Sequence, residues 1–244
     1  MISHESITEA ATTNHTRDFN IAREYVQHLF LSYLYRRFDS DRLLFKGGTA
    51  LRIAYQSPRF SEDLDFSSFG LTAEQIESLF LDTLSDLERI GLPITLHEKS
   101  HATSGGYYGE AKTKIYEHDI VLEINVNTRP GEINVGEYKL IHSDLVPSYS
   151  LQMLPEAILV KEKMDALMSR KKPRDFYDLY FMLRANLIPP ERRENLKQAL
   201  PMVEETNIDF RQELEVFLPQ DYQAIIRHFK QTLLSEMKRN IGTR

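Results

Sequence analysis

The spacing of apolar residues divides the chain into a first part that mixes helix and strand and a second part that is helical. Residues 16–37 carry apolar side chains every three or four positions, which predicts an amphipathic helix. The apolar run 43–45 predicts a short buried strand, and residues 49–55 predict a helix closed by Pro58, because helical geometry is disfavoured before proline. Residues 1–15 are polar and predict a loose segment.

The middle of the chain predicts one more helix and several strands. A helical pattern covers 72–90, and a strand is expected over 94–98, beginning at Ile94 because Pro93 has no N–H for a ladder. A hairpin follows, with arms at 107–116 and 120–126 that turn at 117–119. In the second arm polar and apolar residues alternate, as in a strand with one buried face.

The pattern changes after Pro147, where strands stop and only helical spacing continues. We therefore place a domain boundary near Ser148 and expect domains at 1–147 and 148–244. The predicted fold class is α/β in the broad sense (α+β), with a mixed sheet and helices in the first lobe and helices alone in the second.

Composition fits an ordinary globular protein and excludes some chemistry. The chain has 244 residues, of which 41% are hydrophobic, and no apolar run approaches the roughly 20 residues of a membrane span. The amino terminus lacks a basic region followed by an apolar stretch, so no signal peptide is expected. The absence of cysteine excludes disulfides, thiolate zinc sites and a cysteine nucleophile. These features fit a cytoplasmic protein.

The net charge of −6 is not typical of a nucleic-acid binder, because phosphate neutralisation requires clustered lysine and arginine. Basic residues do cluster locally at 170–174 and 230–244. A solvated surface explains such clusters equally well.

Residues 46–49 predict a binding site for phosphate groups. Gly47 and Gly48 follow a strand and allow the main chain to approach a ligand closely. The helix that begins at Thr49 directs its positive dipole end toward an anion. Thr49 offers a hydroxyl group and a helix cap, and Lys46 offers a positive charge. The Walker A spacing is absent.

Asp63 and Asp65 predict a metal site. Alternate residues of a strand point to one face, so the two carboxylates are able to share one Mg²⁺ or Mn²⁺ ion. A solvent-exposed strand face is the competing interpretation. The glycine turn upstream favours the metal, since a phosphate cradle followed by paired carboxylates suits phosphoryl or nucleotidyl transfer.

Glu123 is a third candidate carboxylate, on the second arm of the hairpin. It is a candidate general base for an attacking hydroxyl. An exposed glutamate on a solvated strand face explains the pattern equally well, and the choice between base and metal ligand stays open.

A second group of polar residues lies on two predicted helices. Lys163 and Arg170 share a helical row, and Lys163 lies at an apolar border, where it is expected either to bind a ligand or to extend to solvent. Arg174 and Asp178 are four residues apart, the spacing of an ordinary surface ion pair. No HExxH or G-x-S-x-G motif is present, so zinc proteases and serine hydrolases have no support.

The wording FKGGTAL followed by RFSEDLDF resembles the AbiEii toxin family, within the DNA polymerase β-like nucleotidyltransferase superfamily. Thirteen residues separate Thr49 from Asp63, a gap similar to that superfamily's pattern. The resemblance implies a polymerase β-like lobe and a carboxy-terminal helical lobe closing over the nucleotide. It implies a metal-dependent nucleotidyltransferase that moves NMP from NTP to RNA, with the tRNA 3′ end as one acceptor.

The family's later motifs, an EK…A…R helix and an R-D-x-x-D helix, are matched here. By resemblance, Lys163 and Arg170 face the triphosphate and Asp178 helps to assemble the site. Lys46, Gly47, Gly48, Thr49 and Ser61 are the expected nucleotide contacts. The family also implies a toxin role, in a toxin–antitoxin or phage-defence pair, with a separately encoded antitoxin.

Two other functions stay open at this point. One is a phosphotransferase that acts on a small molecule or protein with the same phosphate grip. The other is a non-enzymatic module that binds nucleotide or RNA, against which the presence of both aspartates argues. Release of pyrophosphate rather than nucleoside diphosphate distinguishes nucleotidyl transfer from phosphotransfer.

Overall fold

The computed structural model describes residues 1–97, 100–130 and 136–242, and its chain forms two compact units. The first unit comprises Met1–Gln56 and Phe60–Leu154. The second comprises Pro155–Arg244 together with the short segment Ser57–Arg59. The second unit therefore includes three residues that precede the paired aspartates in sequence.

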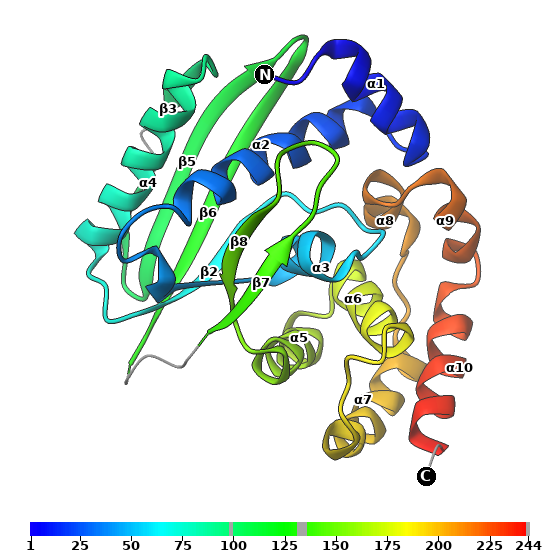
Figure 1. Cartoon of the computed structure of the whole chain (residues 1–244). Helices are drawn as coiled ribbons and strands as arrows, with labels where there is room; N and C mark the ends of the chain where they lie inside the picture. The colour runs from blue at the N-terminus through cyan, green and yellow to red at the C-terminus, as the bar shows by residue number, and fades with distance from the viewer. Residues whose placement is uncertain (98–99, 131–135, 243–244) are drawn as a thin grey trace. The chain divides into compact units, whose positions relative to one another are not determined.

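A mixed sheet forms the centre of the first unit (Figure 1). Its described strands have the order β3-β5-β6-β2-β1-β8-β7, and β4 pairs with β5. The pairs β1–β8 and β2–β6 are parallel, and the other pairs are antiparallel. The strands are β1 (Leu43–Lys46), β2 (Leu64–Phe69), β3 (Ile94–Leu96), β4 (His101–Thr103), β5 (Gly106–Ile115), β6 (His118–Arg129), β7 (Glu137–Ile141) and β8 (Tyr149–Met153).

The helices of the first unit pack on this sheet, except that the first helix packs on the second. They are α1 (His4–Thr13), α2 (Asp18–Leu34), α3 (Gly47–Tyr55) and α4 (Ala73–Arg89), with a short 3₁₀ turn η1 (Ser40–Arg42). Figure 1 shows α2 crossing the long strands, and α2 contacts β6 and β8 while α4 contacts β5. Helix α2 is buried nearly all round, and its buried residues include the polar side chains of Asn20, Arg23 and Gln27 as well as apolar ones.

Alternation along β6 separates the core from the face that carries the candidate residues. Leu122, Ile124 and Val126 are each no more than 3% exposed. Glu123 and Asn125, between them, are half-buried. The predicted alternation of this strand is confirmed, and its polar residues lie on the face opposite to the core.

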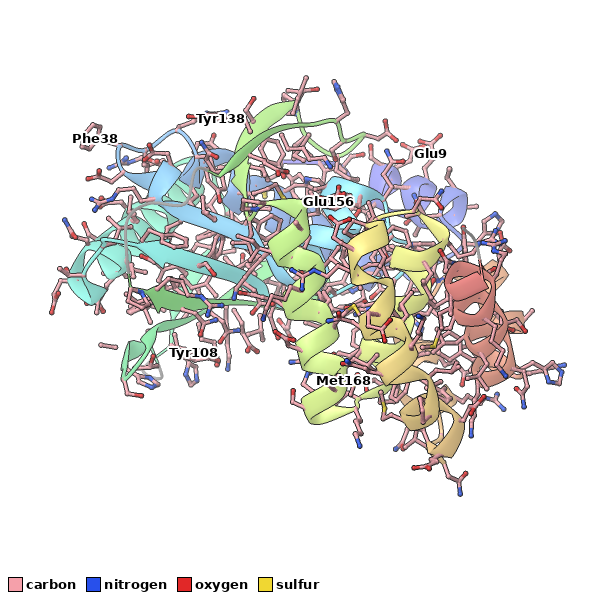
Figure 2. The ribbon with its side chains drawn as sticks, turned by 90° about the horizontal axis from the view of Figure 1, so that it is seen from below. Glu9, Phe38, Tyr108, Tyr138, Glu156 and Met168 are labelled. Carbon is pink, nitrogen blue, oxygen red and sulfur yellow. The ribbon has the colours of Figure 1, made fainter. Side chains whose placement is uncertain are left out.

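The second unit is helical. Its helices are α5 (Glu156–Arg170), α6 (Pro173–Arg184), α7 (Arg193–Glu205), α8 (Arg211–Phe217), α9 (Gln220–Ile226) and α10 (Phe229–Gly242), with the 3₁₀ turn η2 (Pro190–Arg192). Figure 2 shows α5 along its length, with Glu156 and Met168 labelled. Aromatic rings form much of the core, and the Phe210 and Phe229 ring centroids lie 4.9 Å apart. No helix in the described ranges is long and apolar enough to span a membrane.

Most predicted elements are confirmed. The segments 16–37, 43–45 and 49–55 correspond to α2, β1 and α3, and 72–90 corresponds to α4 with a capping box at Thr72. The strand predicted over 94–98 begins at Ile94, as β3, and Glu98 lies outside the described residues.

Three expectations about elements were wrong. Residues 1–15 are not loose: Ser3 caps α1, and Ile7 and Ala11 bury one face of that helix. Strands do not stop after Pro147, because β8 pairs in parallel with β1 and extends the first unit to Leu154. The hairpin turns at 116–117 rather than 117–119, since Tyr116 takes the left-handed φ of 53° that the tight turn needs.

Candidate active site

The connection from β1 to α3 forms a tight glycine turn. Lys46 has extended geometry and caps the helix, and Gly47 follows with a φ of +85°, a conformation that favours glycine. The helix therefore begins at Gly47, and Thr49 lies within its first turn instead of capping it as expected. The first backbone N–H groups of a helix have no intrahelical partner, so this end offers donors to an anion.

Strand pairing places Asp65 beside this helix end. The register pairs Lys46 of β1 with Asp65 of β2. A β-carbon added to Gly47 would lie only 2.1 Å from Oδ2 of Asp65. Glycine is therefore required at position 47 for two reasons: its positive φ, and the closeness of the Asp65 carboxylate, which leaves no space for a side chain.

Asp63 lies immediately before β2, and Thr49 holds its main chain. The Thr49 hydroxyl donates a hydrogen bond to the Asp63 carbonyl oxygen at 2.5 Å, and the Thr49 residue is fully buried. In this structure the hydroxyl positions the aspartate segment. Ser61, two residues earlier, is half-buried, and its carbonyl oxygen accepts a hydrogen bond from Gln27.

Glu123 lies on the strand next to Asp65. The register pairs Asp65 with Asn125, so Glu123, two residues earlier on β6, points to the same face of the sheet. Neighbouring strands lie about 4.8 Å apart, which brings Glu123 close to the aspartates. It is also directly opposite Glu110 on β5.

Tyr108, which is labelled in Figure 2, hydrogen-bonds to the two glutamates. Its hydroxyl lies 2.8 Å from Oε2 of Glu110 and 3.3 Å from Oε2 of Glu123. Burial raises the pKa of Tyr108 well above its ordinary value, and the hydrogen bond to Glu110 and the charge of Glu123 raise it further. The phenol therefore stays protonated at neutral pH and remains a hydrogen-bond donor to this carboxylate pair.

The residues around Gly47 fit a magnesium ion. Mg²⁺ uses one or two protein carboxylates and takes its other ligands from water and substrate phosphates. Asp65 occupies a space that a side chain at position 47 would fill, next to a helix end suited to phosphate. Within the described ranges no group of three or more His, Cys, Asp or Glu side chains is arranged to hold a metal ion. Two carboxylates with substrate ligands match the expected chemistry.

The second unit contains a buried cluster of three charged side chains. Nζ of Lys163 on α5 lies 2.7 Å from Oδ2 of Asp178 on α6. Arg59 donates to the other oxygen, Oδ1, from Nε at 3.1 Å and from Nη2 at 2.9 Å. All three residues are at most 8% exposed.

These contacts exclude two interpretations that the sequence allowed, a solvent-exposed Lys163 and a surface ion pair between Arg174 and Asp178. Lys163 is buried in an ion pair instead of extending to solvent. Asp178 does not pair with Arg174, whose guanidinium lies 3.5 Å from Glu213. Burial alone would raise the pKa of Asp178, but Arg59 and Lys163 outweigh burial and hold that pKa below its ordinary value.

Arg170 is engaged by a carboxylate of its own unit. Its Nη2 lies 2.7 Å from Oδ1 of Asp175, a residue that is 1% exposed. Oδ2 of Asp175 also accepts the backbone N–H of Lys172 and so caps the start of α6. The predicted role of Arg170 at a triphosphate stays a prediction.

The structure groups the predicted site residues into two sets. Lys46, Gly47, Gly48, Thr49, Ser61, Asp63, Asp65 and Glu123 belong to the first unit, and Lys163, Arg170 and Asp178 belong to the second. Sequence reasoning missed Arg59, Gln27 and Tyr108. Gln27 is one of several polar residues on α2 and carried no distinct signal, whereas Arg59 lies inside the quoted motif. Nothing in the sequence marked Tyr108 as functional beyond its position in a strand of alternating residues.

The fold is shared with several solved structures. MenT4, a nucleotidyltransferase toxin from Mycobacterium tuberculosis H37Rv, aligns over 100% of this chain and 91% of its own at 18% identity, with a TM-score of 0.68. JHP933 from Helicobacter pylori aligns over 91% of each chain at 17% identity, with a TM-score of 0.66. A putative nucleotidyltransferase from H. pylori covers 91% of this chain and 94% of its own at 16% identity, with a TM-score of 0.65. At such identities these likenesses establish the fold alone.

Family membership rests on sequence. The family model described as "Nucleotidyl transferase AbiEii toxin, Type IV TA system" matches residues 29–240. The chain therefore belongs to the AbiEii family of nucleotidyltransferase toxins of type IV toxin–antitoxin systems. Membership implies enzyme activity on an NTP and an antitoxin partner. No curated protein shows a significant sequence match to the chain.

We predict that Gly47→Ala weakens binding of Mn²⁺ and lowers the free energy of unfolding. The added β-carbon would displace the Asp65 carboxylate, and alanine at positive φ adds roughly 1–2 kcal/mol of strain. Titration with Mn²⁺ and denaturant unfolding measure the two effects. Gly105→Ala is the control, because its added β-carbon meets no atom within 4 Å. Equal effects of both substitutions would contradict the close contact.

We predict that Asp178→Asn lowers the free energy of unfolding by about 3–5 kcal/mol at pH 7, because two buried cations lose their counter-charge. The folded-state pKa of Asp178 lies below the ordinary value of 3.8. The stabilisation is therefore complete above pH 3.8 and disappears as the pH falls through the folded-state pKa. Denaturant unfolding at several pH values should show the difference between wild type and variant narrowing below pH 3.8.

The control for this pH series is Asp165→Asn. Asp165 pairs with Lys161 on the surface, with 59% of its side chain exposed. Such a pair contributes about 0–1 kcal/mol. A loss for Asp178→Asn that is no larger than the loss for Asp165→Asn would refute the stabilising role of the buried cluster.

Proposed function

We propose that this protein transfers a nucleoside monophosphate from an NTP to an RNA hydroxyl, with release of pyrophosphate. The observation that carries the proposal is the contact between Gly47 at the start of α3 and the Asp65 carboxylate. A carboxylate beside the N-terminal end of a helix supports this proposal, because the carboxylate is suited to a metal ion and the helix end to phosphate. The tRNA 3′ end is the acceptor that we favour.

In this proposal the first unit binds the triphosphate and the metal. Asp63 and Asp65 hold Mg²⁺, or Mn²⁺, which when bound stabilises negative charge on the reacting phosphates. The N–H groups of Gly47, Gly48 and Thr49 bind the β- and γ-phosphates at the start of α3. Lys46 and Ser61 complete the contacts to the nucleotide.

Glu123 is the proposed general base. It takes the proton of the acceptor hydroxyl, whose oxygen attacks the α-phosphorus while the bond to the β-phosphate oxygen breaks and pyrophosphate leaves. The Tyr108 hydroxyl, 3.3 Å from Glu123, orients this carboxylate from the neighbouring strand. A hydrogen bond from a protonated phenol leaves the second carboxylate oxygen able to accept the proton.

Lys163, Arg170 and Asp178 are the proposed contributors from the second unit. An ammonium group has three N–H donors, of which Asp178 takes one from Lys163. The other N–H groups are able to bind phosphate oxygens of the leaving pyrophosphate. Asp178 fixes the ammonium in place, and Arg170 adds positive charge near the start of α6.

The basic stretch that begins at Arg170 is the proposed contact for the acceptor RNA. Lys171 and Lys172 are exposed between α5 and α6. Their charges suit the phosphates of an RNA strand, although the chain as a whole is acidic. Expression without the antitoxin would then harm the host, which is the expected behaviour of a toxin and of a phage-defence component.

We predict that Asp63→Asn and Asp65→Asn each reduce nucleotidyl transfer by roughly 10²-fold or more, because the metal loses a charged ligand. The assay incubates the protein with each labelled NTP, Mg²⁺ and total cellular RNA, and follows labelled RNA and pyrophosphate. EDTA should stop the reaction. Full turnover in EDTA or in either variant would refute the two-carboxylate site, and release of nucleoside diphosphate would identify a phosphotransferase instead.

The same assay tests the second unit through Lys163→Ala. The transition-state stabilisation, obtained from the ratio of kcat/KM for wild type and variant, should fall by about 2–5 kcal/mol, as when a buried charge pair is broken. Lys161→Ala is the matched control on the same helix, since the Lys161 side chain is 53% exposed. If both substitutions leave kcat/KM nearly unchanged, Lys163 has no role in the mechanism.

We predict that expression of the wild-type chain slows growth of a bacterial host and that Asp63→Asn abolishes this effect. Neutralising Lys171 and Lys172 together should lessen toxicity and leave NTP binding intact, because only the RNA contact is weakened. Growth curves and RNA binding at several salt concentrations measure the two effects, and binding should fall steeply with salt. Equal harmlessness of wild type and Asp63→Asn without an antitoxin would refute the toxin role.

A further inference from the structure

The segment that leads into β2 has no regular secondary structure, yet side chains hold its main chain at three consecutive residues. The carbonyl oxygens of Ser61, Glu62 and Asp63 each accept a hydrogen bond from a buried side chain. In a helix or a sheet, backbone N–H groups would satisfy such carbonyls. Here the donors come from α2 and α3 instead.

Gln27 provides two of these three hydrogen bonds. Its Nε2 lies 3.0 Å from the Ser61 carbonyl oxygen and 2.8 Å from the Glu62 carbonyl oxygen. An amide NH₂ group has two N–H bonds, and the geometry uses one for each carbonyl. Gln27 is only 2% exposed and lies on α2, and it is not itself one of the proposed substrate contacts.

Other contacts of the first unit hold the same segment. Arg23, one turn before Gln27 on α2, lies 2.8 Å from the Glu62 carboxylate. The Arg52 guanidinium lies 4.0 Å from the centre of the Phe60 ring. With Thr49 on Asp63, each residue from 60 to 63 has a partner on α2 or α3, so the position of Asp63 is fixed from two helices.

We propose that Gln27 is a positioning residue for the metal-binding carboxylates Asp63 and Asp65. It acts through the main chain, by holding the two residues before Asp63, and it touches neither the metal nor the nucleotide. Two carboxylates bind one ion well only when their oxygens are held at the required spacing, so a mobile segment weakens the site. This inference rests on the proposed function, because it assumes that the two aspartates bind a metal.

The test is the affinity of the full-length protein for Mn²⁺, measured by electron paramagnetic resonance without nucleotide. Gln27→Met keeps the side-chain shape and removes both N–H donors. We expect its Kd for Mn²⁺ to rise about 10–100-fold, in the range found when groups that orient metal ligands are removed. Turnover should fall in the same preparation, with folding verified by circular dichroism.

Gln152→Met is the matched control. Gln152 is a buried glutamine on β8 in the same unit, 7% exposed, whose Oε1 has no hydrogen-bond partner within the described ranges. Its substitution should leave the Kd for Mn²⁺ within twofold of wild type. A Gln27→Met protein that is less stable but binds Mn²⁺ within twofold of wild type would show a structural role alone and overturn the inference.

Asp63→Asn separates this inference from the proposed function. If Asp63→Asn abolishes Mn²⁺ binding and Gln27→Met does not weaken it, only the positioning role fails. If wild type and Asp63→Asn bind Mn²⁺ equally, or neither binds it, the metal site and the positioning role fail together.

A second variant, Gln27→Glu, tests the inference even if the Gln27→Met protein does not fold. An ionised glutamate cannot donate to the two carbonyls, whereas a protonated one donates a single hydrogen bond. The ratio of its Kd for Mn²⁺ to the wild-type Kd should therefore narrow as the pH is lowered from 8 toward 5. A ratio close to one at every pH would overturn the inference.

Discussion

The close contact between Gly47 and the Asp65 carboxylate is the constraint on which the proposed site depends. It follows from the antiparallel register of β1 and β2, which aligns Lys46 with Asp65. A shift of one residue would turn Asp65 into the core and bring Leu64 to the helix end. Phe45 and Phe66, both fully buried, prevent this shift, because their rings pack together with centroids 5.5 Å apart. Packing in the core thus fixes the register of β1 and β2, and with it the position of Asp65 on the opposite face of the sheet.

Buried polar side chains hold the backbone in place where the chain forms neither helix nor strand. The segment before β2 and the segment 57–59 are irregular, and both are held by charged or amide groups that α2, α3 and α6 bury. A buried polar group destabilises the fold unless it is paired, so each of these contacts also selects one conformation of the backbone. In the first unit the conformation selected is the one that sets Asp63 next to β2.

Much of the fold was predictable because its signals are local. The periodicity of α2 and α4, the glycine turn and the alternation of β6 each show in a window of fewer than twenty residues. Helix α1 was missed because only Ile7 and Ala11 mark its buried face. Strand β8 was missed because it is five residues long and lies between Pro147 and Pro155. It pairs along its length with β7 and also with β1, about a hundred residues earlier, and no local pattern reveals that second pairing.

The candidate residues of the site were predictable from two short motifs, but their contacts were not. Lys163 and Asp178 were both chosen from sequence, whereas their direct ion pair depends on the packing of α5 against α6. Arg59 was not chosen, because its partner lies 119 residues away in the chain. Sequence spacing instead favoured Arg174 as the partner of Asp178. Burial decided against it, since the side chains of Arg59 and Asp178 are only 4% and 2% exposed.

The placement of residues 57–59 in the second unit has a consequence for how such proteins can recombine. A helical unit exchanged as one continuous stretch from residue 155 onward would leave its Arg59 behind. The incoming Asp178 would then meet whatever residue the recipient carries in a loop 119 residues upstream. Successful exchange between relatives therefore requires segment 57–59 to be exchanged together with the stretch from Pro155 onward, because both belong to the second unit.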